Sequence, residues 1–118
     1  MASTWLIFRI LGSSIIVPIA EELAFRGYLM RKLVATDFEN VSIGQFSWLS
    51  FIVSSLCFGF LHDDWFAGTL AGMGYAIVVY KKGNLGDAIA AHMTTNILIA
   101  ITVLRFDQWS LWSWIFSR

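Results

Sequence analysis

The sequence predicts an all-α protein, a polytopic membrane helical bundle of about four transmembrane helices with an aromatic interfacial segment at its C-terminus. Of the 118 residues, 58% are hydrophobic and only 14% are charged, and a soluble domain this short could not bury so much apolar surface. The apolar residues form long runs separated by short polar turns, as expected for successive membrane spans. Because no internal repeat or linker divides the chain, residues 1–118 are expected to form a single membrane-embedded domain.

The first predicted span runs from about Trp5 to about Leu33. At about 1.5 Å per residue it is longer than the roughly 30 Å hydrocarbon core requires, so we expect it to tilt, bend or protrude. Pro18 is the only proline. It deprives the Ser14 carbonyl of its helical partner and therefore favours a kink at this point. Arg31 and Lys32 end the span at a polar interface.

The second predicted span runs from about Ile43 to about His62 and is almost entirely apolar. The connection before it, Thr36–Asn40, is typical of a short surface loop, and we expect Asn40 or Ser42 to cap the helix that follows. Cys57 is the only cysteine in the sequence. An intrachain disulfide and a thiolate metal cluster are therefore excluded.

The third predicted span, about Trp65 to Tyr80, carries Gly68 and Gly72 four residues apart. This small-xxx-small spacing predicts close packing against a neighbouring helix. The fourth span, about Leu85 to Leu104, is expected to begin at an Asn84 cap. The C-terminal segment is rich in aromatic residues that favour a membrane interface, namely Trp109, Trp112, Trp114 and Phe116.

The distribution of charges predicts an orientation in the membrane. With four spans, the basic pairs at 31–32 and 81–82 fall on one side, and the acidic pair at 63–64 falls on the other. By the positive-inside rule the lysine side is cytoplasmic. The formal net charge is +0, which argues against nucleic acid as a partner because such binding needs a basic surplus.

The stretch that organises the chain holds three charges inside the first apolar span, Glu21, Glu22 and Arg26. Each charge at the centre of a membrane helix costs on the order of 3 kcal/mol, so these residues are expected to have internal partners and a function. Glu22 and Arg26 are four residues apart and can pair across one turn, whereas Glu21 lies about 100° further round the helix. The alternative is a helix that leaves the membrane and shows a charged face to water.

Two later spans add further polar groups: His62, and the pair His92 and Asn96, which share one helix face. Polar side chains in a membrane bundle avoid lipid by facing the interior, so one wet cavity is the economical prediction. Taken alone, a histidine at a helix end such as His62 is more typical of an interfacial residue than of a functional one.

Three motifs occur in order on successive spans: Glu-Glu-x-x-x-Arg at 21–26, Phe-x-x-x-His at 58–62 and His-x-x-x-Asn at 92–96. Together they closely resemble the CPBP intramembrane proteases, which include CAAX prenyl endopeptidases and bacteriocin-processing or self-immunity proteins. The resemblance spans about Val17 to Ala100. Val17-Pro18 and Gly86-Asp87-Ala88 are most similar to the branch that accompanies bacterial exosortases. Members usually have six or more membrane helices, so the resemblance implies that this chain is a catalytic core or a fragment.

The resemblance implies a glutamic-type intramembrane endopeptidase. Glu21, helped by His62, would act as the general base that activates a water molecule. His92 and Asn96 would donate hydrogen bonds to the oxyanion, Glu22 and Arg26 would hold the helix geometry as an ion pair, and Phe58 would bind substrate as part of the pocket wall. The residues assigned to catalysis are Glu21, Glu22, Arg26, His62, His92 and Asn96.

Two other interpretations remain open at this stage. Glu21, His62 and His92 match a catalytic zinc ligand set, so a zinc-dependent membrane hydrolase is the alternative to a mechanism without metal or cofactor. The same groups could also form a proton or cation path in a transporter or immunity module. The expected partners are the lipid bilayer, a membrane-associated peptide or protein substrate and an exosortase-type protein. The expected location is the bacterial inner membrane.

If the helices are straight, Glu21, His62 and His92 do not lie at the same depth in the membrane. Counted from the lysine side, Glu21 lies about 15 Å and His92 about 12 Å into the bundle, but His62 lies about 25 Å from a start near Phe46. The second span could be tilted, could begin within the bilayer, or the site could lie nearer the acidic side.

Overall fold

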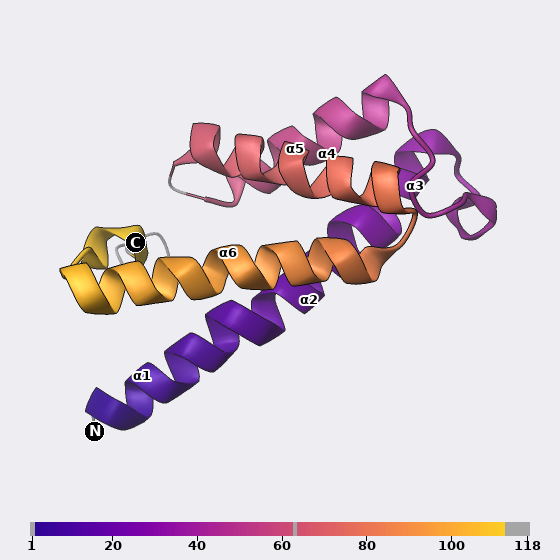
Figure 1. Ribbon diagram of the computed structural model, residues 1–118. Coiled ribbons are helices and arrows are strands. Elements are labelled where there is room, and N and C mark those ends of the chain that lie inside the picture. The colour runs from indigo at the N-terminus through magenta and orange to yellow at the C-terminus, as the bar shows by residue number, and fades with distance from the viewer. Residues whose placement is uncertain (1, 63, 113–118) are drawn as a thin grey trace.

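The computed structural model describes residues 2–62 and 64–112. Every regular element in this part of the chain is helical, which confirms the predicted all-α class. The helices run back and forth along one long axis, and the principal extents are 47 × 24 × 21 Å (Figure 1). The predicted interfacial residues Trp114 and Phe116 lie outside the described residues.

The first helix is continuous over Ala2–Val34. Two stretches within it are π-helical, with backbone bonds from Val17 N–H to the Gly12 carbonyl and from Met30 N–H to the Phe25 carbonyl. Such wide turns are rare and often occur at functional sites. The two glutamates lie between them. The parts in chain order are α1 (Ala2–Leu11), η1 (Gly12–Ile16), α2 (Val17–Glu22), η2 (Leu23–Leu29) and α3 (Met30–Val34).

The second helix, α4 (Trp48–Phe60), is shorter than predicted. Ser47 caps it by accepting the Ser50 N–H at 3.0 Å, so the prediction of a cap at Asn40 or Ser42 is wrong. The preceding connection contains one 3-10 turn, Phe38–Asn40. It also contains Gly44, at φ 87°, where an added Cβ would lie 2.8 Å from the Val79 carbonyl oxygen. The connection therefore packs against the next helix instead of extending α4.

The third helix, α5 (Trp65–Lys82), packs closely against α4. A Cβ added at Gly68 would lie 3.1 Å from the Gly59 Cα, and one added at Gly72 would lie 3.0 Å from the Phe58 ring. The predicted role of the small-xxx-small pair is thus confirmed. Gly59 is tighter still, because its Cβ would lie 2.0 Å from Thr69 Oγ1.

We expect Gly59→Ala to lower the thermal stability of the purified protein in detergent, because the α4–α5 contact has no room for a methyl group. Overpacking of this kind typically destabilises by about 1–3 kcal/mol. Gly74→Ala is the matched control, since nothing lies within 4 Å of the Cβ added there. The control is expected to be neutral or slightly stabilising, because alanine favours a helix more than glycine does. Equal melting temperatures for the two variants would contradict the packing argument.

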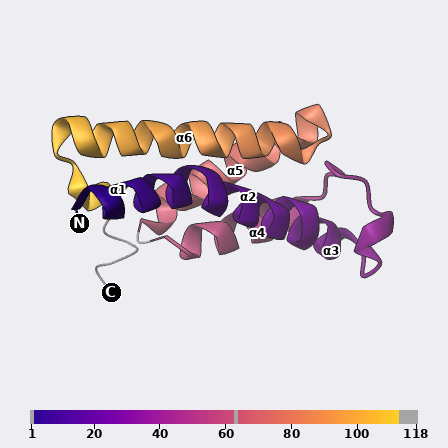
Figure 2. The ribbon, with the colours of Figure 1, turned by 90° about the horizontal axis from the view of Figure 1, so that it is seen from below.

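The last long helix, α6 (Leu85–Phe106), begins as predicted, with the Asn84 side chain accepting the Asp87 N–H at 2.9 Å. Seen from below, α6 lies on one side of the layer that contains α1, α2 and α4 (Figure 2). After Asp107, whose φ is 54°, the chain turns into the short 3-10 segment η4 (Trp109–Trp112).

Two helices of the described chain are long and apolar enough to cross a membrane, Ala2–Val34 and Leu85–Phe106. The helix α4 is apolar but has only 13 residues. The count of four transmembrane helices therefore stays a prediction. The outer surface is nonetheless suited to lipid, since large apolar side chains such as Phe8, Trp48 and Leu98 are exposed.

The end of α3 and the connection from α5 to α6 lie at the same end of the molecule (Figure 1). In a Cys57→Ala background, we therefore expect a cysteine at Lys82 to be labelled from the cytoplasmic face. A cysteine at Asp64 should be labelled from the opposite face, because the basic end stays inside. A membrane-impermeant maleimide applied to oriented vesicles makes the measurement. Labelling of the cysteine at position 64 from the cytoplasm alone would refute this topology.

Candidate active site

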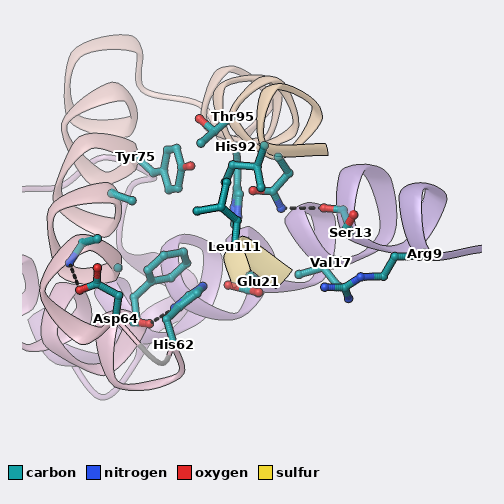
Figure 3. Close-up of a pocket in the computed structure, with 16 residues that line it drawn as sticks. Arg9, Ser13, Val17, Glu21, His62, Asp64, Tyr75, His92, Thr95 and Leu111 are labelled. Carbon is teal, nitrogen blue, oxygen red and sulfur yellow. Dashed lines mark hydrogen bonds between the residues drawn. The ribbon is translucent and has the colours of Figure 1, made fainter. Parts of the chain in front are cut away.

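A cavity of about 200 Å³ lies between the first helix, α6 and the α4–α5 pair (Figure 3). The structure thereby brings together polar residues from three predicted spans, as expected. The predicted site residues that line the cavity are Glu21, Phe58, His62, His92 and Asn96. Glu22 and Arg26 lie behind it, and both are fully buried.

Glu21 lies near the end of α2 and lines the cavity. Its Oε2 atom is buried and has no hydrogen-bond partner within the described part of the chain. Both His62 and His92 are close enough to interact with its charge. A buried carboxylate oxygen without a partner is costly. Glu22 Oε1 is also buried without a partner in the described chain, but of the two glutamates it is Glu21 that lines the cavity.

Glu22 connects three helices. Its Oε2 atom accepts a hydrogen bond from Arg26 Nη1 at 3.3 Å, which confirms the predicted ion pair, and a second from His92 Nδ1 at 2.8 Å. Arg26 in turn donates through Nη2 to the Gly72 carbonyl on α5. The contact with His92 joins residues 70 positions apart, and local spacing gives no sign of it.

His92 is held on three sides. Its Nδ1 is bound to Glu22, the Tyr75 ring stacks on it with centroids 4.5 Å apart and planes 17° apart, and the Phe58 ring meets it edge-on at 5.6 Å. With Nδ1 engaged, Nε2 is the ring nitrogen left for cavity chemistry. Tyr75 is a residue that the sequence analysis missed. Its spacing from Gly68 and Gly72, seven and three residues on along α5, is the signal that could have placed it on the same face.

His62 follows the end of α4 and donates from Nδ1 to the Phe58 carbonyl at 2.9 Å. Its Nε2 is thereby left as an acceptor in the neutral tautomer. The centroid of the Phe58 ring lies 5.0 Å from the centroid of the His62 ring and 4.8 Å from the guanidinium carbon of Arg26. Phe58 therefore forms a wall shared by both histidines, in agreement with its predicted position.

Asn96 lines the cavity, but its Nδ2 atom donates to the backbone carbonyl of Ser13 at 2.6 Å. That carbonyl is available because of the local helix geometry. Its α-helical partner, Val17 N–H, bonds to Gly12 instead, and its π-helical partner would be Pro18, which has no N–H. One amide N–H of Asn96 thus fixes α6 to the first helix, and the other remains for a ligand.

The model of one protein family, type II CAAX prenyl endopeptidase Rce1-like, matches residues 3–98. The matched range contains all three motifs and most of the chain. This chain belongs to the Rce1-like family. No curated protein and no solved structure matches it. Membership identifies an Rce1-like protease of the membrane that acts on a membrane-associated protein substrate, and the long apolar helices agree with an integral membrane location.

The zinc alternative for this Rce1-like protein depends on whether its donors can meet at one ion. Within residues 2–62 and 64–112, no group of three histidine, cysteine, aspartate or glutamate side chains is arranged to hold a metal. His62 and His92 both use Nδ1 for protein contacts. A carboxylate on the far nitrogen, as Glu22 supplies to His92, is also typical of zinc-binding histidines. The donor chemistry therefore leaves zinc as a hypothesis for experiment.

Proposed function

We propose that this Rce1-like protein is an intramembrane endopeptidase in which Glu21 activates the hydrolytic water. The observation that carries the proposal is the buried, unpartnered Oε2 of Glu21 in a cavity that His62 and His92 also line. A carboxylate removed from bulk water and aimed at a cavity is suited to accept a proton.

In the proposed reaction Glu21 takes one proton from water, and the resulting hydroxide attacks the peptide carbonyl carbon. His62, which lines the cavity beside Glu21, helps to orient the water. In its imidazolium form His92 donates Nδ1–H to Glu22 and Nε2–H to the carbonyl oxygen, where it and the remaining N–H of Asn96 stabilise the negative charge. When the carbon–nitrogen bond breaks, the proton on Glu21 passes to the leaving amine, and the carboxylate is regenerated.

The positions of the supporting residues favour this division of roles. Glu22 binds His92 and Arg26 through Oε2 and does not line the cavity, so it is suited to hold the site instead of binding water. We propose a membrane-bound peptide or protein as substrate. An exosortase-type partner and a bacterial inner-membrane location stay predictions of the sequence resemblance.

The test of the mechanism is hydrolysis of a peptide pool by the purified protein in vesicles, read by mass spectrometry, with metal content measured in parallel. We expect activity to persist after dialysis against a chelator, with no stoichiometric zinc bound. Stoichiometric zinc, together with activity that a chelator removes and added zinc restores, would overturn the glutamate–water mechanism. Glu21, His62 and His92 would then be reassigned as ligands.

A further inference from the structure

Tyr75 is the α5 residue whose ring meets His92. The two rings are stacked, with centroids 4.5 Å apart and planes 17° apart, a spacing typical of aromatic pairs. The other α5 residues that line the cavity, Ala67, Gly68 and Ala71, have no polar side-chain atom. Tyr75 lines the same cavity and is only 7% exposed, yet the mechanism described above gives it no part.

The plane of the His92 ring is not fixed by its hydrogen bond alone. Glu22 holds the ring at Nδ1, and a ring held at one atom can still pivot and move Nε2. The stacked Tyr75 ring lies against one face of His92 and restricts this pivot, and the Phe58 ring meets it at 65°. With the plane fixed, Nε2 keeps one position relative to Glu21, as a preorganised hydrogen-bond donor requires.

Tyr75 is itself held by its neighbours, as a group that orients another must be. Its hydroxyl is close enough to the Thr95 side chain for a hydrogen bond. Its ring packs edge-on against Phe58, with centroids 5.9 Å apart, and the Arg26 guanidinium carbon lies 5.8 Å from its centroid. Figure 3 shows the Tyr75 side chain extending from α5 toward Thr95 and His92 on α6. Tyr75 therefore links α5 to the part of α6 that carries the histidine.

We propose that Tyr75 is a positioning residue that fixes the His92 ring so that Nε2–H meets the carbonyl oxygen in the transition state. The proposal rests on the peptidase function proposed above, and in this role Tyr75 acts through His92 and not on the substrate. The face of an aromatic ring also attracts a cation. The stack therefore favours the imidazolium form of His92, which the proposed reaction uses.

The first experiment measures kcat and KM for substitutions of Tyr75. Tyr75→Leu removes the ring and should lower kcat at least about tenfold with KM near the wild-type value, because small errors in the placement of a catalytic group are costly. Tyr75→Phe keeps the ring and should retain the rate within about threefold. Tyr80→Leu is the control, since Tyr80 lies on the same helix, packs against Phe46 and Phe51 and does not line the cavity. It should keep the wild-type kcat.

A double-substitution cycle with His92→Gln separates positioning from general packing. If Tyr75 acts through His92, Tyr75→Leu should lower the single-turnover rate in the wild-type background and have little further effect in the His92→Gln background. Equal losses in the two backgrounds would overturn the proposal. A loss in Tyr75→Phe as large as in Tyr75→Leu would overturn it as well, because the ring would then not be the cause.

The orientation of His92 can also be measured without hydrolysis. The sequence has 2 histidines, so NMR of selectively labelled histidine rings in detergent gives two sets of signals, which His62→Gln assigns. The stacked ring should shift the His92 ring protons upfield in the wild type and in Tyr75→Phe, but not in Tyr75→Leu. This pattern in a wild-type protein without hydrolysis would reject the peptidase and support Tyr75 as the residue that orients His92. Unchanged His92 signals in Tyr75→Leu would overturn the proposal, whether or not the protein hydrolyses peptides.

Discussion

Glu21→Gln should abolish peptide hydrolysis and leave the bundle folded. Glutamine keeps the size of the side chain but cannot accept the proton of water, and loss of a general base typically lowers a rate by about 10²–10⁴-fold. Folding should be retained because Glu21 Oε2 makes no hydrogen bond within the described chain. Single-turnover hydrolysis with excess enzyme, read by mass spectrometry, and thermal melting followed by circular dichroism make the two measurements.

The matched control for this substitution is Glu39→Gln. Glu39 is the remaining glutamate of the chain and is exposed in the 3-10 turn before α4. It should keep both wild-type turnover and wild-type melting. Full turnover by purified Glu21→Gln would reject Glu21 as the base, and a strong loss of melting temperature in that variant would show that it contributes to the fold.

Glu22→Gln should have the largest effect on stability. Glu22 and Arg26 are both 0% exposed, and the substitution leaves the guanidinium charge without its carboxylate. Breaking a buried ion pair from one side typically destabilises by about 3–5 kcal/mol. Glutamine can still accept the His92 Nδ1 hydrogen bond, so the lost stability reports the unpaired charge of Arg26. The free energy of unfolding in detergent, from denaturant titration, measures it.

The double substitution Glu22→Gln, Arg26→Met tests the cause. If the unpaired charge is responsible, replacing Arg26 with an apolar side chain of similar length should recover part of the lost stability, so that the two changes are strongly non-additive. Additive losses would mean that the two residues stabilise the protein independently, and that the 3.3 Å contact contributes little.

The parts of the fold that the sequence predicts well are those that depend on local chemistry. The Asn84 cap, the Glu22–Arg26 pair and the close approach at Gly68 and Gly72 all follow from spacings of three or four residues. The helical class follows from composition. These features require no knowledge of how one helix is placed against another.

The features that sequence could not supply depend on the register between helices. Straight-helix counting separated His62 from Glu21 and His92, yet all three line one cavity. The start of α4 at Trp48, two residues after Phe46, accounts for only about 3 Å of that difference. His62 also lies beyond the helix end, where the Phe58 carbonyl holds its ring.

The same limit applies to the partners of His92. Its contacts with Glu22 and Tyr75 come from two other helices, and neither motif spacing nor hydropathy contains that information. The π-helical bonding of η1 is similarly invisible in sequence, although Pro18 marks its neighbourhood. The Asn96–Ser13 bond depends on that geometry.

The π-helical stretch η1 sets the rotational phase of the first helix. In an uninterrupted α-helix, twelve residues at about 100° each would place Arg9 and Glu21 about 120° apart around the axis. A π turn absorbs one extra residue, so the two side chains are offset by about 20° and share a face. Deleting one residue from Gly12–Ile16 would restore regular α-helix with eleven steps between the two positions, so the offset would stay near 20° and Arg9 would remain on the cavity face.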